Sequence, residues 1–269
     1  MMRWGQRARS LARALRQYCC RMGVWAWMST SPKITRSPND CWRQGTERLR
    51  RIALYDLDRT VTRAPTFTPF LVHMAASGNP LRLLLAPLWI LAMLGYKAKL
   101  YGRKSLKQFG LRLLVGKVVR SPALQPRIDR FVTRQLAHNI QPGARAQIAA
   151  DRSAGVTLVL ITAAPAIYAT ALAEALGFEA CIATRHQCLS DGSLLALIDG
   201  ENNYGSEKVA RIEGWLAEQG LTRADCHLTA YTDHASDAPI LNYADAGVLV
   251  GRYAKPDLRC AQVDWSGTA

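Results

Sequence analysis

Short apolar runs alternate with amphipathic stretches through most of the chain after residue 50. Each apolar run is short and bounded by polar residues or glycine, which is typical of strands buried in a sheet. These runs predict strands at residues 51–56, 156–161, 179–183, 227–231 and 247–250. The stretches between them carry apolar residues at helical spacing and predict helices at residues 143–154, 165–176, 206–219 and 236–243. Strands that alternate with helices predict an α/β fold with a mostly parallel sheet covered on both faces.

Residues 66–141 depart from this alternation. They are rich in Leu and Ala and have a helical pattern, with breaks only at residues 78–80 (Gly-Asn-Pro) and 121–122 (Ser-Pro). A block of this length is too long for a simple crossover, so it predicts a helical cap inserted after the first strand. The predicted organisation is a basic, disordered N-terminal extension at residues 1–50, a core formed by residues 51–65 and 142–269, and a helical cap at residues 66–141.

The net charge of +15 is distributed unevenly. Residues 1–50 hold eleven lysines and arginines against two acids, which leaves +6 for the rest of the chain. That mild excess requires no nucleic-acid partner, and none is expected. The extension has three open interpretations: a disordered or misassigned segment with Met28 as the true start, an Arg-rich targeting peptide, or a basic arm for anionic lipid or nucleic acid. The seven cysteines form no CxxC pair, which favours a reducing cytoplasm over a disulfide framework or a zinc site.

Polar side chains follow three of the predicted strands at the point where each strand ends. Asp56 and Asp58 come after the first strand, Thr162 after the second, and Asp233 and Asp237 after the strand at residues 227–231. The carboxyl ends of parallel strands meet at one edge of a sheet, where ligands bind, so these side chains are expected to surround one pocket. Four carboxylates gathered in one place disfavour each other's ionised forms unless a cation is present. Oxygen ligands without a His or Cys cluster favour Mg²⁺.

Such a set of groups can transfer a phosphoryl group. A carboxylate beside a bound cation can attack phosphorus and form an aspartyl-phosphate that water later cleaves. Lys208, near the start of the helix at residues 206–219, can neutralise phosphate oxygens, and the Thr162 hydroxyl can donate a hydrogen bond to them.

Four segments in this order resemble the four motifs of the haloacid dehalogenase (HAD) superfamily. They are DLDRT at residues 56–60, ITAAP at 161–165, YGSEK at 204–208 and DHASD at 233–237. The resemblance implies a three-layer, Rossmann-like α/β core with a parallel sheet and an inserted helical cap. The insert directly after the first motif, together with a predicted hairpin at residues 184–198 whose turn is Asp191-Gly192, resembles subfamily IB, which contains phosphoserine phosphatase.

The resemblance also implies roles for residues of all four motifs. Asp56 would be the nucleophile, and Asp58 would protonate the leaving group and then activate water. The Mg²⁺ ligands would be the Asp56 carboxylate, the backbone carbonyl of Asp58 and Asp233. Thr162 and Lys208 would bind phosphate, and Asp237 would support the metal or Lys208.

The chain departs from the family pattern at two positions. Arg59 stands where a small residue is common, and it is expected either to reach the cap or a second anionic group of the substrate, or to be a solvated or structural arginine. Thr232 precedes the fourth motif where Gly is common, which puts the shape of that loop in question.

The expected activity is Mg²⁺-dependent hydrolysis of a phosphomonoester on a small molecule or a lipid. Two alternatives stay open: phosphoserine phosphatase proper, and a non-catalytic module that binds membrane or nucleic acid. Residues 63–70 contain no acid to pair with a substrate ammonium group, which argues against phosphoserine.

The segment at residues 79–100 is strongly apolar and is flanked by Arg82, Lys97 and Lys99. It is expected to form either the buried interior of the cap or an interfacial helix that contacts the membrane, and it resembles the cap of HAD-type phosphatidylglycerophosphate phosphatases. Its longest uncharged run, residues 83–95, has 13 residues and is too short to span a bilayer. The expected location is the cytoplasm, with peripheral attachment to the inner face of the membrane as the second option.

Overall fold

The computed structural model describes residues 49–251 and 260–267, so the predicted N-terminal extension lies outside the described residues except for Leu49 and Arg50. Their centre is a sheet of six parallel strands in the order β4-β3-β1-β7-β8-β9. The strands are β1 (Arg50–Tyr55), β3 (Thr157–Pro165), β4 (Ala180–Thr184), β7 (Cys226–Thr232), β8 (Ala246–Val250) and β9 (Ala261–Val263). The five predicted strands are confirmed, and β9 is an additional edge strand that the sequence pattern missed.

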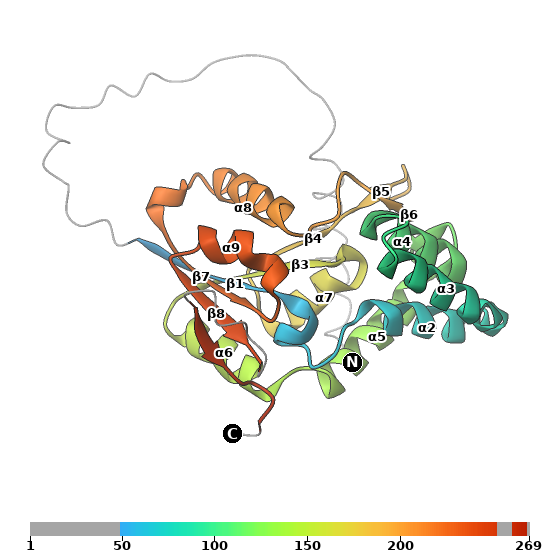
Figure 1. Cartoon of the computed structure of the whole chain (residues 1–269), viewed down its shortest axis with the longest axis horizontal. Helices are drawn as coiled ribbons and strands as arrows, with labels where there is room; N and C mark the ends of the chain where they lie inside the picture. Colours follow the sequence, from blue (N-terminus) through green and yellow to red (C-terminus); the bar gives the residue numbers. More distant parts are fainter. Residues whose placement is uncertain (1–48, 252–259, 268–269) are drawn as a thin grey trace, which may run out of the picture. The chain divides into compact units, whose positions relative to one another are not determined.

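Helices cover both faces of the sheet (Figure 1). They are α6 (Pro142–Ser153) and α7 (Ala166–Leu176) on one face, and α8 (Ser206–Glu218) and α9 (Ala238–Tyr243) on the other. Alternate side chains of a strand point to opposite faces. In β1, Ala53 and Tyr55 therefore pack with α6 and α7, while Ile52 and Leu54 pack with α8 and α9. The predicted three-layer α/β fold is confirmed.

A helical insertion separates β1 from β3, as predicted. Its elements are α2 (Phe67–Gly78), the 3₁₀ helix η3 (Pro80–Leu85), α3 (Ala86–Lys97), α4 (Arg103–Gly110), the short π-turn η4 (Leu111–Val115) and α5 (Gln125–His138). The helices break at the two predicted sites and also between α3 and α4, where Lys99 has a φ of 60°. The backbone at Lys99 is left-handed, which ends the preceding helix.

One part of the predicted helical block is a strand. β2 (Val118–Arg120) pairs with β6 (Leu194–Ile198), which in turn pairs with β5 (His186–Cys188) in a second, antiparallel sheet. Strands β5 and β6 form the predicted hairpin. Because β2 belongs to the insertion and the hairpin follows β4, the second sheet ties the insertion to the core. The predicted helical pattern includes the β-branched pair Val118-Val119, and pairing with β6 overrides this local pattern.

The apolar segment of η3 and α3 is largely exposed, and the expectation of a buried cap interior is wrong for most of it. Within the described part of the chain, the helical stretch Pro80–Lys97 has 18 residues and a mean hydropathy of 1.2, and only 6% of it is buried. That length and composition would suffice to cross a membrane. The helix runs through Arg82 and ends at Lys97, so it exceeds the 13-residue uncharged run counted from the sequence.

Trp89 is the most deeply buried side chain of α3, which also packs inward through Met93 and Tyr96. Trp89 is 4% exposed and packs against Phe67 with ring centroids 6.0 Å apart. Gly110, the last residue of α4, lies under the Trp89 ring: a Cβ at this position would come within 2.6 Å of the ring and within 2.9 Å of Leu71. Glycine is required here for close packing, since its backbone conformation is ordinary helix.

We predict that Gly110→Ala destabilises the protein by about 1–3 kcal/mol, because the added methyl group displaces Trp89. Chemical denaturation of the full chain measures this change. Gly214→Ala is the matched control, since Gly214 lies exposed within α8 with no atom in reach of the added Cβ. That variant should be more stable by roughly 0.5–1 kcal/mol through helix propensity alone. Equal effects of the two substitutions would contradict the packing role of Gly110.

Candidate functional site

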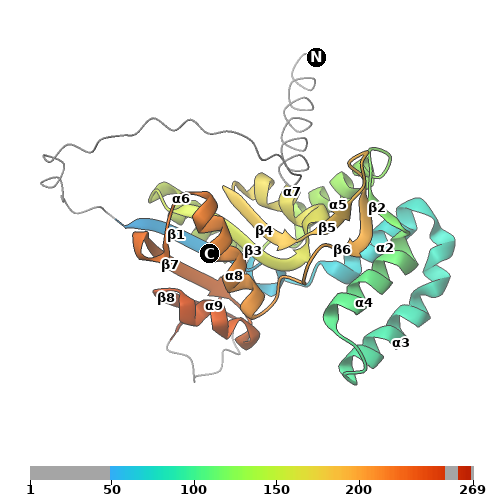
Figure 2. The same ribbon diagram turned by 90° about the horizontal axis from the view of Figure 1, so that it is seen from above.

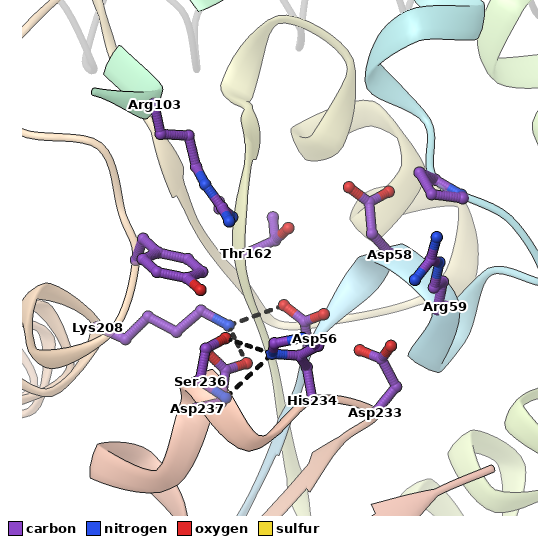
Figure 3. A pocket seen from close by; sticks show the side chains of 13 residues that line it. Asp56, Asp58, Arg59, Arg103, Thr162, Lys208, Asp233, His234, Ser236 and Asp237 are labelled. Carbon is purple, nitrogen blue, oxygen red and sulfur yellow. Dashed lines mark hydrogen bonds and ion pairs between the residues drawn. The ribbon is translucent and has the colours of Figure 1, made fainter. Parts of the chain in front are cut away.

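The predicted site residues come together around one pocket of about 330 Å³ at the carboxyl edge of the main sheet (Figure 3). Their side chains come from the turn after β1, the end of β3, the start of α8 and the loop after β7. The insertion contributes Arg103 and the segment before α2 contributes Pro65. The pocket is lined by all six predicted residues: Asp56, Asp58, Thr162, Lys208, Asp233 and Asp237.

A buried ion pair links three elements at the floor of this pocket. The Lys208 Nζ donates to Asp56 Oδ1 at 2.8 Å and to Asp237 Oδ2 at 2.6 Å. Thr232 donates a further hydrogen bond of 2.9 Å to Asp237 Oδ2. Lys208 is only 2% exposed, so both carboxylates are needed to compensate the loss of its hydration. Thr232, at the position where the family often has Gly, therefore acts as a hydrogen-bond donor to Asp237.

Burial governs the protonation of these groups. It raises the pKa of Asp56 to about 7, although the charge of Lys208 acts in the opposite direction. For Lys208, burial opposes the charged form, but Asp56 and Asp237 together raise its pKa above the ordinary value. Lys208 therefore remains a cation, fixed beside Asp56. The raised pKa of Asp56 shows that its ionised form lacks compensating charge. A further positive charge bound next to it would therefore stabilise the carboxylate.

Asp58 points away from Lys208 and is held by the start of the insertion. Its Oδ1 accepts hydrogen bonds from the backbone N–H and the hydroxyl of Thr66, both at 2.8 Å. The Thr66 hydroxyl also lies 3.0 Å from the Tyr168 hydroxyl on α7. Burial raises the pKa of Asp58, and the two bonds from Thr66 only partly offset this effect. The net effect is that Asp58 holds its proton more firmly than an exposed aspartic acid does.

The turn between Asp56 and the insertion has an unusual backbone. Arg59 has a φ of 64°, which a residue with a Cβ adopts at a cost of about 1–2 kcal/mol. This conformation explains why a small residue is common at this position in the family, since a position with positive φ favours Gly. The Arg59 side chain is exposed at the pocket. Gln141 supports the turn, because its Nε2 donates to the carbonyls of Arg59 at 2.9 Å and Thr60 at 2.8 Å.

Thr162 lies at the opposite wall, 1% exposed as a residue, and its hydroxyl accepts a 3.0 Å hydrogen bond from the Ala164 N–H. Asn203 holds this strand end in place. Its Nδ2 donates to the Thr162 carbonyl at 2.9 Å and to the Ile182 carbonyl on β4 at 2.7 Å. The neighbouring strand ends are thereby fixed at the position of the pocket.

Two basic residues of α4 enter the site region from the insertion. Lys107 is 8% exposed; its Nζ donates to the carbonyl of Ala163 and, at 2.6 Å, to Asn202 Oδ1. Burial, together with the nearby charge of Arg103, lowers the pKa of Lys107 to about 7. The Arg103 guanidinium lies 3.8 Å from the centre of the Tyr204 ring, at the pocket wall. The insertion thus adds positive charge opposite the carboxylates.

The donor atoms in the pocket fit a hard divalent cation. Asp233 is half-buried on the same side of the pocket as Asp56 (Figure 3), and burial raises its pKa. The neighbouring His234 is exposed and bonds Ser236 through Nδ1 at 2.7 Å. Among residues 49–251 and 260–267, no three His, Cys, Asp or Glu side chains form a metal cluster. The expected ligand set has only two carboxylates and would complete its coordination with a main-chain carbonyl and water, as Mg²⁺ commonly does.

Sequence reasoning missed several residues that shape the site, among them Lys107, Gln141 and Asn203. These three are polar residues with 8% exposure or less, and they donate to backbone carbonyls in the segments that carry the predicted site residues. None belongs to a motif. A buried lysine in an amphipathic helix resembles any solvated lysine until the helix is packed against the core.

Comparisons with known proteins agree with this geometry. The family model described as haloacid dehalogenase-like hydrolase matches residues 53–242. The chain is 34% identical over 107 residues to protein CicA of Caulobacter vibrioides, a match that covers 39% of this chain and 46% of CicA. The chain thus spans about half the length of this curated relative.

Solved structures share the fold. A Bordetella pertussis protein of unknown function has a TM-score of 0.70 and 24% identity, covering 81% of this chain and 99% of that one. A phospho-aspartyl intermediate analogue of phosphoserine phosphatase has a TM-score of 0.55 and 17% identity, covering 81% of this chain and 94% of that one. The strand order, the insertion after β1, and the family match to 190 consecutive residues lead to one conclusion: this chain is a hydrolase that belongs to the haloacid dehalogenase-like family.

Proposed function

We propose that the protein is a Mg²⁺-dependent phosphomonoester hydrolase that forms an aspartyl-phosphate on Asp56. The observation that carries the proposal is the buried contact of Lys208 with Asp56 at 2.8 Å, at the floor of a pocket that also contains Asp58. A carboxylate whose one oxygen is held by a fixed cation is oriented for attack by the other. The solved phosphoserine phosphatase of the same fold, described as a phospho-aspartyl intermediate analogue, agrees with this chemistry.

The first half-reaction moves the phosphoryl group to the protein. A carboxylate oxygen of Asp56 attacks phosphorus, the bond between phosphorus and the leaving-group oxygen breaks, and Asp58 gives its proton to that oxygen. The raised pKa of Asp58 supports this role, because a general acid must be protonated when the reaction starts. Lys208 and the Thr162 hydroxyl stabilise the phosphate oxygens.

The second half-reaction releases phosphate. Asp58, now ionised, takes a proton from water, the water oxygen attacks phosphorus, and the bond to Asp56 breaks to give inorganic phosphate and the free carboxylate. Thr66 keeps Asp58 at one place in both steps, since two hydrogen bonds of 2.8 Å fix its Oδ1.

Enzymes of this family are typically Mg²⁺-dependent, and the oxygen donors of the pocket suit that ion. Asp56, the Asp58 carbonyl and Asp233 would hold it, and when bound it supplies positive charge that screens the phosphate from the carboxylates. The raised pKa values of Asp56 and Asp233 support this assignment, because buried carboxylates without enough compensating charge are the expected state of such a site before the cation binds.

The charge of the pocket favours a purely anionic phosphate over phosphoserine. Between residues 60 and 141 the pocket is lined by Pro65 and Arg103, and neither can pair with a substrate ammonium group. The four acids that line it are all assigned to the reaction, the metal or Lys208. Arg59 and Arg103 are placed to contact further oxygens of the substrate.

We predict that Asp56→Asn lowers hydrolysis of an aryl phosphate by on the order of 10⁴-fold, because an amide cannot serve as the nucleophile. Steady-state release of the aryl alcohol measures this loss. A chelator of divalent cations should likewise abolish activity of the unaltered protein, and added Mg²⁺ should restore it. Asp191→Asn, in the hairpin turn where Asn is equally suited, is the matched control and should retain full activity. Equal rates for Asp56→Asn and the unaltered protein would exclude Asp56 as the nucleophile.

We predict a different signature for Asp58→Asn. With an aryl phosphate the leaving group needs little protonation, so the phosphoenzyme still forms, but water is no longer activated and turnover falls by roughly 10²–10⁴-fold. Mass spectrometry of acid-quenched protein should then show a phosphoryl group on Asp56. With an alkyl phosphate the first step should fail as well. Identical losses on both substrates, without trapped phosphoprotein, would count against the acid–base role.

Lys107 is proposed as a positioning residue that holds the Thr162 strand end from the side of the insertion. Lys107→Met removes the hydrogen bonds from Nζ to the Ala163 carbonyl and to Asn202, which then keep only their contacts with the Thr184 hydroxyl, at a cost of about 1–3 kcal/mol. The expected result is a roughly tenfold or greater rise in KM with a smaller change in kcat, since phosphate binding is affected first. Lys104→Met is the control, because Lys104 makes only a surface ion pair with Glu201. A loss of stability with unchanged KM would reduce Lys107 to a structural role.

A further inference from the structure

The exposed side of η3 and α3 is an apolar surface without a partner in the described structure. Its members lie three or four residues from one another along η3 and α3 and are 40–77% exposed. We define this surface as the α3 apolar face: Leu81, Leu84, Leu85, Leu88, Ile90, Leu91 and Leu94. A helix that is apolar on all sides is normally buried in a protein core or in lipid. Figure 2 shows α3 on the outer side of the insertion, with α4 between it and the core.

Basic residues dominate the insertion that carries this face. Residues 66–141 contain twelve lysines and arginines and a single acid, Asp129. The core formed by residues 51–65 and 142–269 has the opposite balance, with twelve bases and seventeen acids. Lys97, Lys99 and Arg112 lie exposed in or beside the segments that carry the apolar face. The charge of the chain after residue 50 is therefore separated into a basic insertion and an acidic core.

The exposed apolar residues and the basic residues around them together favour one kind of partner for the α3 apolar face. A second copy of the chain would bring two basic surfaces together around a two-fold axis, which electrostatic repulsion disfavours. An anionic bilayer offers apolar depth for the leucines and negative headgroups for the bases. The acidic core is repelled from the same surface, so both parts of the chain favour one orientation.

We propose that the α3 apolar face and the basic residues around it dock the protein onto an anionic lipid bilayer. The face inserts into the headgroup and acyl-chain boundary, while Lys97, Lys99 and Arg112 contact lipid phosphates. A hydrogen bond connects the docked helix to the pocket: the Arg103 Nε donates to the Tyr96 hydroxyl at 3.1 Å, and Arg103 lines the pocket. The docking does not depend on the proposed reaction, and a variant inactive at Asp56 should bind equally well.

Flotation of the full chain with vesicles tests the proposal. Vesicles of phosphatidylcholine with roughly one-third phosphatidylglycerol should carry the protein, while pure phosphatidylcholine should carry several-fold less. The double substitution Leu84→Glu and Leu91→Glu places charge on two positions that are 77% and 62% exposed, so the fold should be retained, which circular dichroism checks. It should reduce the bound fraction by roughly tenfold. Leu189→Glu, in the hairpin and 42% exposed, is the matched control and should bind normally.

The bases of residues 1–50 are a second source of attraction to anionic lipid, so the site of contact is measured separately. Hydrogen–deuterium exchange of the full chain should show protection of peptides that cover residues 80–100 when vesicles are added. Protection confined to residues 1–50, or equal binding of the double variant, overturns the proposal. Self-association that the double substitution abolishes, without vesicle binding by the unaltered chain, would assign the face to a second copy and likewise overturn it.

Discussion

The buried contact of Lys208 with Asp56 and Asp237 is the interaction on which the site depends. A lysine with 2% exposure is stable as a cation only where carboxylates replace its water, and both partners must come from other elements of the sheet edge. This contact affects the protonation of Lys208 and of the carboxylates alike. The carboxylates keep Lys208 charged, while burial keeps the pKa of Asp56 raised to about 7 and leaves the pocket ready for a further positive charge. A strand order that separated β1 from β7 would remove this arrangement, since Asp56 and Asp237 follow those neighbouring strands.

The insertion is part of the site and does more than cover it. Thr66 binds Asp58, Lys107 binds the backbone next to Thr162, and β2 pairs with the hairpin strand β6. The first two contacts reach separate walls of the pocket, and the third ties the insertion to the hairpin. A movement of the insertion would therefore change the position of the acid, of the phosphate-facing strand end and of the hairpin together, which couples access to the pocket with the arrangement of its groups.

The parts of the fold that were predicted correctly share a local cause. Each central strand is a short apolar run, and each predicted site residue follows such a run or begins a helix with clear amphipathic spacing. The failures had non-local causes. β2 forms because β6 is available to pair with it, and β9 is three residues long at the edge of the sheet, with a burial pattern too open to give an apolar run. Arg59 could be recognised as a departure from the family pattern, but its left-handed backbone was visible only in the folded turn.

By itself the sequence determined the order of strands and helices, the identity of the acids, Thr162 and Lys208, and the family to which the chain belongs, because these depend on residue types and short spacings. Only the tertiary structure decided which polar side chains complete the pocket and which apolar ones remain outside the core. Lys107 and Leu84 illustrate the reason: the lysine is 8% exposed and the leucine 77%, the reverse of their hydropathies. Burial is a property of the packed helices, and a residue's own chemistry does not specify what will lie against it.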